Sequence, residues 1–476
     1  MLRRSTTASA TALLLALAAG PAAADHGGCD CTVIQRVIAA GPADYLSLLP
    51  GLQPGDLLQL SAGTYPEGLP LTDLHGQPGN CIVIAGPGPG YGPGPRAVFT
   101  GSNCCNTVSL AESSYLVIRD LELDGLGRVG DAVKAEGTAA FVHHVTLEGL
   151  YVHGHGADQQ IVGINTKCPT WGWAIRRNVI EGAGTGIYLG NSDGEDEFSD
   201  GLIEHNLIVD TLGYNLQIKH QNGRATGQGA PAAGVTIVRR NVFSKAEGGA
   251  GGGDARPNVL IGHRPLAGPG SDDDTLVYGN FFWQNPTEAL LQAEGHVILY
   301  ANLMVNDDGP AVHFQAHEDV PRRVRVFHNT VIADGVGIQV LAGHPAFEQR
   351  VIGNAVFGDP ALNGGTQLDN TTGAYAAAGS FLANPDGMLS GPDRLDLYPL
   401  AGTLGGPVDT TGLLGFPDAG VDFNGALRTE SFRGAYAGEG GNPGWLPTLE
   451  IMPPAGVLFA DGFESGDLSG WSDVVP

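Results

Sequence analysis

The chain is poor in lysine, in charged residues generally and in long apolar runs. Only four lysines occur among its 476 residues, and the excess of 50 acidic over 24 basic residues gives a formal net charge of −26 at pH 7. Such an acidic surface excludes nucleic acid and anionic membrane surfaces as partners. Beyond the N-terminal stretch, no segment approaches the roughly 20 apolar residues of a membrane-spanning helix, which excludes membrane insertion. The acidity is typical of a chain kept soluble in an extracellular medium.

Residues 1–24 have the layout of a secretory signal peptide. Arg3 and Arg4 form a short positive region, an apolar run follows from Ala10 to Gly20, and small residues suited to cleavage precede Asp25. The run is too short to anchor the chain stably in a bilayer. We therefore expect a secreted protein, either extracellular or held in the periplasm or at the cell surface.

Cysteine is scarce, and all six cysteines lie in the first third of the mature chain. In an oxidising compartment they can form up to three disulfides, whose pairing the sequence leaves open. Zinc binding is disfavoured because the paired Cys-x-x-Cys spacing of zinc sites is missing. The disulfide candidates are Cys29, Cys31, Cys81, Cys104, Cys105 and Cys168.

What the chain has in abundance is glycine and proline, with 74 and 31 residues, as expected for short strands joined by tight turns. Seven segments share an asparagine flanked on both sides by apolar residues, at intervals of 22 to 39 residues. Such a strand-like repeat is typical of a solenoid, and the asparagines suit a bend where side-chain amides stack from coil to coil. The asparagines are Asn178, Asn206, Asn241, Asn280, Asn302, Asn329 and Asn354.

Each repeat carries a second strand-like segment, such as residues 186–190 or 215–219. Alternation places Ile187 and Leu189 inward and leaves the alternate side chains on one continuous exposed sheet. The sequence therefore predicts an all-β fold: a single-stranded, right-handed parallel β-helix with an asparagine ladder and one long polar face.

Two further regions carry a resemblance to a known family. Residues 55–65 (GDLLQLSAGTY) are similar to the opening coil of β-helix polysaccharide lyases of the pectate-lyase type, and residues 398–402, 422–428 and 434–436 are similar to their usual C-terminal coils. The resemblance covers most of the mature chain and implies the fold, although a fold does not fix an activity.

The predicted organisation follows from these regions. A signal peptide (1–24) precedes an N-terminal cap with the first coils and the disulfides (25–100), and the main β-helix spans 101–360. C-terminal coils and a cap span 361–446. A linker with a short tail motif (447–476) ends the chain; it serves sorting or attachment, or is a disordered acidic end.

Two of the four lysines are predicted to lie on the exposed sheet. Lys167 and Lys219 occupy the same outward position two coils apart, roughly 10 Å from each other, and Lys134 joins them if its coil is shifted in register. Such a strip predicts a groove for an acidic sugar polymer. The residues expected to bind substrate along it are Lys167, Tyr188, Gln217, Gln221, His313, Gln315 and His317.

Cleavage of a uronic-acid polymer by β-elimination needs a group that neutralises the carboxylate, a base for the C5 proton and an acid for the leaving oxygen. β-Helix polysaccharide lyases often use Lys, Arg or His for these roles, commonly with calcium. The resemblance implies Lys219 as base, Arg264 or Arg224 at the carboxylate, and His220 or His263 as supporting or alternative bases. A plainer interpretation also stands: Lys219 is a solvated surface residue, and the two histidines, at inward positions, stack on each other.

Two loops border this strip. Residues 222–257, with a glycine run at 248–253, are long enough to form a substrate-binding flap or a disordered excursion. A dense acidic loop offers calcium ligands, although its spacing is not that of an EF-hand and such loops are most often just solvated. Its predicted ligands are Asp193, Glu195, Asp196 and Glu197.

The exposed strands lack the paired aspartates of β-helix glycoside hydrolases. The function predicted is therefore a secreted, monomeric lyase that cleaves an anionic glycan, with calcium as a possible cofactor. Two alternatives remain: a noncatalytic β-helix that binds a glycan or a surface partner, and a uronan C5-epimerase, which begins with the same proton abstraction.

Overall fold

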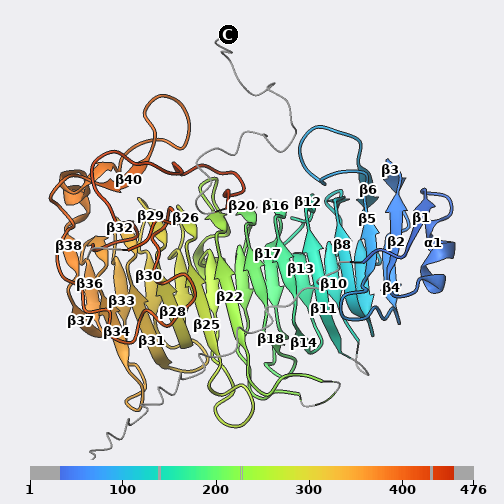
Figure 1. Ribbon diagram of the computed structural model, residues 1–476, viewed down its shortest axis with the longest axis horizontal. Coiled ribbons are helices and arrows are strands. Elements are labelled where there is room, and N and C mark those ends of the chain that lie inside the picture. Colours follow the sequence, from blue (N-terminus) through green and yellow to red (C-terminus); the bar gives the residue numbers. More distant parts are fainter. Residues whose placement is uncertain (1–32, 138–140, 226, 228, 429–431, 455–476) are drawn as a thin grey trace, which may run out of the picture.

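The computed structural model describes residues 33–137, 141–225, 227, 229–428 and 432–454. Within these residues, almost every strand belongs to one of three long parallel sheets that run side by side along the molecule (Figure 1). The signal-peptide prediction (1–24) lies outside the described residues, as do Cys29, Cys31 and most of the predicted tail.

The three sheets are named here by number. Sheet 1 contains β1 (Arg36–Ala40), β2 (Asp56–Leu60), β5 (Ile82–Ala85), β8 (Ser114–Arg119), β11 (Val142–Glu148), β14 (Thr170–Trp171), β15 (Ala174–Arg176), β18 (Phe198–Ser199), β19 (Leu202–Glu204), β22 (Val235–Arg239), β25 (Asp274–Tyr278), β28 (Gly295–Tyr300), β31 (Pro321–Phe327), β34 (Gln349–Ile352) and β37 (Thr366–Leu368). Sheet 2 contains β3 (Gly63–Tyr65), β6 (Ala97–Thr100), β9 (Leu121–Asp124), β12 (Tyr151–His153), β16 (Val179–Glu181), β20 (Leu207–Val209), β23 (Val242–Ser244), β26 (Phe281–Trp283), β29 (Leu303–Asn306), β32 (Thr330–Ala333), β35 (Ala355–Phe357) and β38 (Thr371–Gly373). Sheet 3 contains β4 (Leu69–Thr72), β7 (Val108–Ala111), β10 (Val133–Ala135), β13 (Val162–Thr166), β17 (Thr185–Leu189), β21 (Leu216–Ile218), β24 (Val259–Ile261), β27 (Leu291–Ala293), β30 (Val312–Phe314), β33 (Ile338–Val340) and β36 (Leu362–Gly364).

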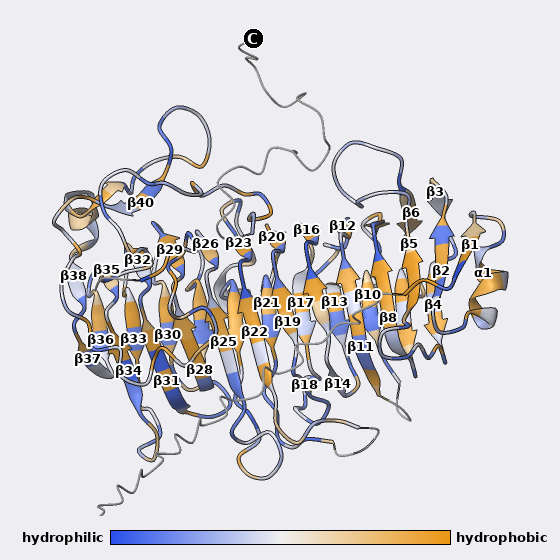
Figure 2. Ribbon diagram, viewed as in Figure 1, coloured by the Kyte–Doolittle hydropathy of each residue, from blue (hydrophilic) through white to orange (hydrophobic). Residues whose placement is uncertain are grey.

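Each coil contributes one strand to each sheet, and strands of successive coils pair in parallel. In sheet 3, for example, Ile187 of β17 pairs with Leu216 of β21, which pairs with Val259 of β24. The inward residues of all three sheets form one apolar core that extends from Ala40 to Val356, visible as the orange strands of Figure 2. The predicted parallel β-helix is confirmed.

The asparagine ladder is present at one corner of the helix. The Nδ2 atom of each of the seven predicted asparagines donates to the Oδ1 atom of the next at 2.9–3.0 Å, and Asn370 ends the row as an eighth member that the repeat pattern missed. The left-handed turn belongs to the residue before each asparagine, for instance Arg177 and His328 with φ of 54°. The asparagine therefore ties coils together while its neighbour makes the bend.

Short irregular elements close both ends of the helix. At the N-terminal end, α1 (Tyr45–Leu48) and the 3₁₀ turn η1 (Leu49–Gly51) bring Tyr45 against Tyr65 and Phe99. At the C-terminal end lie a 3₁₀ turn, η3 (Tyr375–Ser380), and the antiparallel pair β39 (Leu382–Asn384) and β40 (Asp396–Pro399).

The chain after β38 returns along the outside of the helix (Figure 1). Leu397, Tyr436 and Met452 pack on outward apolar residues of sheet 2, and Leu413 and Phe416 pack on those of sheet 1. No described residue after β38 takes part in such packing on the outer face of sheet 3. The face predicted to be polar is thus the one left uncovered. No helix in the described ranges is long and apolar enough to cross a membrane.

Candidate functional site: a cationic groove on sheet 3

One in-register row of outward side chains crosses sheet 3. Successive residues of a strand face opposite sides of the sheet, so one residue of each strand points away from the core at the same register position. Nine of the ten members are polar or aromatic with a polar tip. The row runs through Ser109, Lys134, Asn165, Tyr188, Gln217, Leu260, Gln292, His313, Gln339 and Asn363.

A groove of about 480 Å³ lies over the middle of this row. Of the seven predicted binding residues, four line it, and so does Lys219, the predicted base. It also takes in residues from the segment before β24 and from the coil before β13. Its lining is Gln159, Gln160, Val162, Asn165, Lys167, Thr185, Tyr188, Ser192, Tyr214, Gln217, Lys219, Ala255, Arg256, Pro257, Leu260, Glu288, Gln292 and His317.

Lys167 and Lys219 stand at the same register position, two residues after Asn165 and Gln217, with Gly190 between them. The predicted alignment of the two lysines is therefore confirmed. Lys134 pairs with Asn165 in register, so it belongs to the neighbouring row of side chains.

Lys167 lies partly buried against an aromatic ring. Its Nζ atom is 3.9 Å from the ring centroid of Tyr188 and donates to Ser192 Oγ at 3.4 Å. Burial lowers the pKa of Lys167 to about 8, and the charges of Lys134 and Lys219 act in the same direction against those of Asp131 and Asp193. Near neutral pH, Lys167 can therefore exchange a proton far more readily than an ordinary lysine.

Lys219 is held by an acidic partner. Its Nζ atom donates to Glu318 Oε1 at 3.3 Å. Glu318 follows β30 in a loop whose backbone N–H groups at residues 317, 318 and 319 all donate to Glu294 Oε2 at 2.8–3.0 Å. The other oxygen of Glu294 accepts the N–H of His263, so this fully buried carboxylate fixes the loop that faces Lys219.

Both arginines predicted to hold a substrate carboxylate lie away from the groove. Arg264 is 2 % exposed and donates to Thr275 Oγ1 on β25 and to the carbonyl of Phe198. Burial lowers its pKa to about 10. The side chain of Arg224 is buried in an ion pair with Asp273. The expected placement of both in the groove is wrong, because the strand alternation ends before each of them: β24 ends at Ile261, before Arg264, and β21 ends at Ile218, before Arg224.

His220, His263 and Gln221 are also buried beside the groove rather than in it. The two histidine rings lie against each other with centroids 5.3 Å apart, as the plainer interpretation expected, but they are tilted by 32° rather than stacked. Gln221 Nε2 donates to the carbonyl of Phe198. Burial, reinforced by the charge of Lys219, lowers the pKa of His220, whose Nδ1 atom is 3.7 Å from Glu318 Oε1. The structure thus places these three behind the lysine, without access to the groove.

The three histidine and glutamine residues predicted to bind substrate near the C-terminal end of the groove lie in two places. His317 lines the groove, whereas His313 and Gln315 follow the same face beyond its C-terminal end. Burial lowers the pKa of His313.

The sequence prediction missed Arg256, which supplies the groove with a third cation. Its guanidinium is 6.0 Å from the ring centroid of Tyr214. Its carbonyl accepts hydrogen bonds from Lys245 Nζ at 2.8 Å and from Asn285 Nδ2 at 3.0 Å. Lys245 is fully buried, and burial lowers its pKa to about 8. The one signal in the sequence is that Arg256 lies three residues after the end of the glycine run at Gly253.

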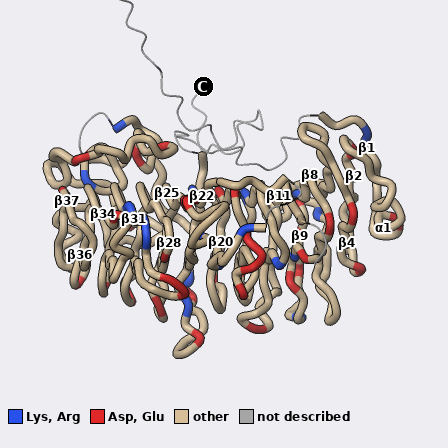
Figure 3. Tube along the Cα trace, turned by 90° about the horizontal axis from the view of Figure 1, so that it is seen from below, with Lys and Arg blue, Asp and Glu red and all other residues tan. Residues whose placement is uncertain are grey.

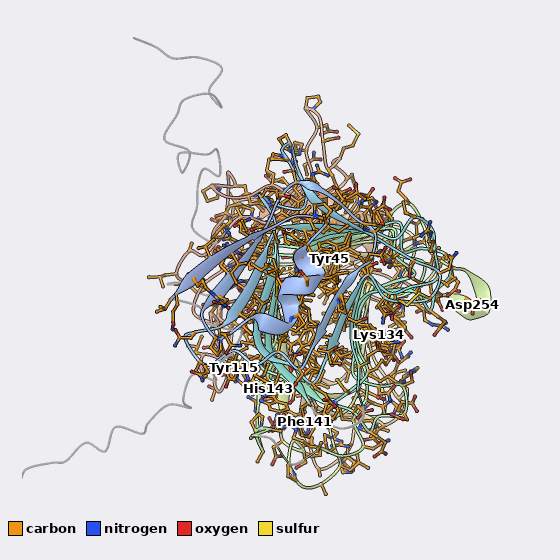
Figure 4. The ribbon with its side chains drawn as sticks, turned by 90° about the vertical axis from the view of Figure 1, so that its right-hand side faces the viewer. Tyr45, Tyr115, Lys134, Phe141, His143 and Asp254 are labelled. Carbon is orange, nitrogen blue, oxygen red and sulfur yellow. A yellow bond between two sulfur atoms is a disulfide. The ribbon has the colours of Figure 1, made fainter. Side chains whose placement is uncertain are left out.

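The segment 222–257 is not a single loop, because β22 and β23 lie inside it. Only its last part borders the groove, through residues 255–257, which directly follow the 3₁₀ turn η2 (Gly252–Asp254). Gln159 Nε2 donates to the carbonyl of Asp254 at 2.8 Å and ties this part to the coil below. In Figure 4, which looks along the helix from its N-terminal end, Asp254 lies on the same side as Lys134.

The carboxylates of the acidic loop accept hydrogen bonds mainly from neighbouring residues of the same loop. Asp193 Oδ1 accepts the N–H of Glu195, Asp196 Oδ2 accepts from Asn191 Nδ2, and the buried Glu197 accepts the N–H of Ala225. Across the described ranges, no three His, Cys, Asp or Glu side chains are placed to hold a metal ion. Calcium binding here stays a prediction.

Cysteines Cys104 and Cys105 form a disulfide with each other, and Cys81 is disulfide-bonded as well. Cys168 is free and buried in the core, so its predicted disulfide is wrong.

The fold and the groove define a parallel β-helix protein with one uncovered, cation-lined face. No family model matches the sequence, and no curated protein matches it. Solved structures similar to this chain include an alginate lyase from Paenibacillus sp. str. FPU-7, with 15% identity over 71% of this chain and 98% of that one and a TM-score of 0.41. Pectate lyase Pel9A has 12% identity over 88% of this chain and 100% of that one, with a TM-score of 0.41. A GH136 lacto-N-biosidase from Eubacterium ramulus has 12% identity, coverage of 71% and 68%, and a TM-score of 0.39. The fold assignment rests on the strand pairing above, and no activity follows from likeness at this level.

Proposed function

We propose that the protein binds an anionic, uronic-acid glycan along the groove of sheet 3 and cleaves it by β-elimination. The observation that carries the proposal is the placement of two of the four lysines, Lys167 and Lys219, together with Arg256 in one groove of a chain of net charge −26. Lys134 lies on the adjoining coil, outside the groove. Acidic positions, by contrast, are spread along the molecule (Figure 3). Cations gathered in one groove attract and orient a polyanion.

The groove offers a group for each step of the elimination. Lys219 and Arg256 neutralise the substrate carboxylate, which stabilises the negative charge that develops when C5 loses its proton. Lys167, with its pKa of about 8, is the base that takes this proton. The electron pair left at C5 forms the double bond to C4 as the C4–O bond breaks. Tyr188, whose pKa is raised by burial, keeps its proton at neutral pH and donates it to the leaving oxygen.

This assignment revises the role of Lys219 implied by the sequence. Its ammonium group is already engaged by Glu318, whereas Lys167 is desolvated against Tyr188. A hydrolytic mechanism fits less well, because it requires two carboxyl groups across the scissile bond and Glu288 is the one carboxylic acid among the described lining residues.

The first test is an assay on a panel of polyuronates, including pectate, alginate and glycosaminoglycans, each with and without calcium. Absorbance of the unsaturated product reports β-elimination. The proposal expects such a product from at least one polymer, and the panel also identifies the polymer and any calcium requirement. Binding without product supports a noncatalytic glycan-binding protein instead, and hydrogen exchange at C5 without cleavage supports the epimerase.

Lys167→Met is the decisive variant. It should lower kcat by about a thousandfold, within the range of lost general-base catalysis, while Arg119→Met, an exposed cation on β8 of sheet 1, should leave kcat unchanged. Because the free amine is the base, kcat/KM of the wild type should rise about tenfold per pH unit and level off near pH 8. A Lys167→Met enzyme with normal kcat would refute the assignment of the base.

Secretion belongs to the same proposal, because polyuronates are extracellular substrates and the first 24 residues have the layout of a signal peptide.

A further inference from the structure

A second cavity lies on sheet 3 at the N-terminal end of the groove. Its volume is about 460 Å³, and it is lined in part by the Cys104–Cys105 disulfide. Neither cysteine is buried. The other lining residues are Asn103, Asn106, Ser109, Val129, Gly130, Lys134 and Glu136.

This cavity and the groove occupy neighbouring strands of one surface. Ser109 and Lys134, in the cavity, are the row members directly before Asn165 and Tyr188, in the groove. Asp131 joins the two: its Oδ2 atom accepts from Asn165 Nδ2 at 2.8 Å and lies 4.0 Å from Lys134 Nζ. Figure 4 shows Lys134 on the same side of the molecule as Asp254 of η2.

An unpaired polar atom points to a ligand at the junction. Asn165 is 3 % exposed and lines the groove, yet its Oδ1 atom has no hydrogen-bond partner. A buried acceptor without a partner costs about 1–3 kcal/mol, a cost that a ligand hydroxyl donating to it would remove.

The chemistry of the cavity differs from that of the groove. The ammonium of Lys134 is balanced by Glu136 at 3.5 Å, and Asn106 donates to the same glutamate. Paired charges and amides suit sugar hydroxyls, which both donate and accept. The disulfide adds a polarizable apolar wall for the C–H face of a ring, and its loop is fastened by hydrogen bonds from Gly101 N–H to Asp124 and from Thr107 N–H to Asp131.

We propose that this cavity is an extension of the binding site, in which the Cys104–Cys105 disulfide and Lys134 hold further sugar rings of the glycan chain bound in the groove. From Ser109 on β7 to Gln292 on β27 the row crosses six strand spacings of about 4.8 Å, or roughly 29 Å. A sugar ring in a chain is about as long as one such spacing, so the full site holds about six rings. The inference rests on the proposed function.

Binding of oligouronates of different length tests the extension. The Kd of a trimer and of an octamer is measured by calorimetry in the Lys167→Met background, so that no cleavage occurs. We expect the octamer to bind at least about tenfold more tightly than the trimer. Ser109→Trp, which fills the cavity, and the double variant Cys104→Ser/Cys105→Ser should each reduce this ratio to about two.

Gln339→Trp is the matched control, because Gln339 occupies the same row on β33 outside both cavities. It should keep the wild-type ratio. Ser109→Trp leaves the disulfide intact, so it still tests the extension of the site if the double variant does not fold. Equal affinities for trimer and octamer, or a ratio unchanged by Ser109→Trp, would overturn the extension alone, whereas failure of both oligomers to bind would overturn the proposed function itself.

Discussion

At the residue scale, burial decides what each charged side chain of this protein does. Glu294 uses both oxygens to accept four backbone N–H groups, and so fixes the loop that carries Glu318 to Lys219. Arg264, equally buried, is a structural residue. Lys167 lies between these extremes, desolvated enough for its pKa to fall to about 8 but still lining the groove.

Buried His328 makes stability depend on pH. It precedes Asn329 of the ladder, is 4 % exposed, and burial together with the charge of Arg428 lowers its pKa to about 3. In the unfolded chain this histidine has its ordinary pKa of about 6.5. Between that pH and about pH 3 it is therefore protonated in the unfolded chain but neutral in the folded one. The contribution of neutral His328 to the free energy of unfolding is therefore full above about pH 6.5 and is lost as the pH falls toward 3.

Between pH 7 and pH 5 this linkage should remove about 2 kcal/mol of unfolding free energy from the wild type. His328→Asn, which tolerates the left-handed backbone (φ 54°), should lose about 2 kcal/mol less than the wild type over the same interval. Denaturant unfolding at the two pH values measures both losses. Equal losses in the two proteins would show that His328 is not responsible.

At the scale of elements, what the sequence predicted well is what repeats. The ladder asparagines recur in successive coils from Asn178 onward, and apolar inward residues recur along sheet 3, so Asn178, Asn354 and Ile187 could be placed without a structure. The site was predicted best next to the strands, as for Lys167 and Lys219, which directly follow β13 and β21. Arg264 was misplaced because the alternation ends with β24, and Arg256 was missed because it belongs to a segment without periodicity.

The ladder should stabilise the helix most where it is buried. The Oδ1 atom of Asn280 accepts two hydrogen bonds from Asn241, and its Nδ2 atom donates to Asn302 Oδ1 and to the carbonyl of Val238. Asn280→Leu leaves these buried partners unsatisfied and should lower the free energy of unfolding by about 3 kcal/mol or more.

Asn370→Leu is the control for this prediction, because Asn370 makes similar bonds at the partly exposed end of the ladder, where water can replace them. It should cost clearly less. If denaturant midpoints show the two substitutions to be equally destabilising, burial does not govern the strength of the ladder.

At the scale of the whole molecule, the C-terminal chain divides the surface of the helix into covered and open faces. Leu397 and Tyr436 cover apolar residues of sheet 2, and Phe416 covers those of sheet 1. Sheet 3 keeps its polar row and the two cavities open along one side. A long open face of this kind suits a linear polymer lying along the axis of the helix.

The structure of the Lys167→Met protein in complex with an oligouronate tests this account most directly. The account predicts a sugar chain lying over sheet 3, with a carboxylate in ionic contact with Lys219 or Arg256 and a hydroxyl donating to Asn165 Oδ1. An oligouronate bound on sheet 1 or sheet 2, or bound over sheet 3 with its carboxylates turned away from both cations, would contradict it.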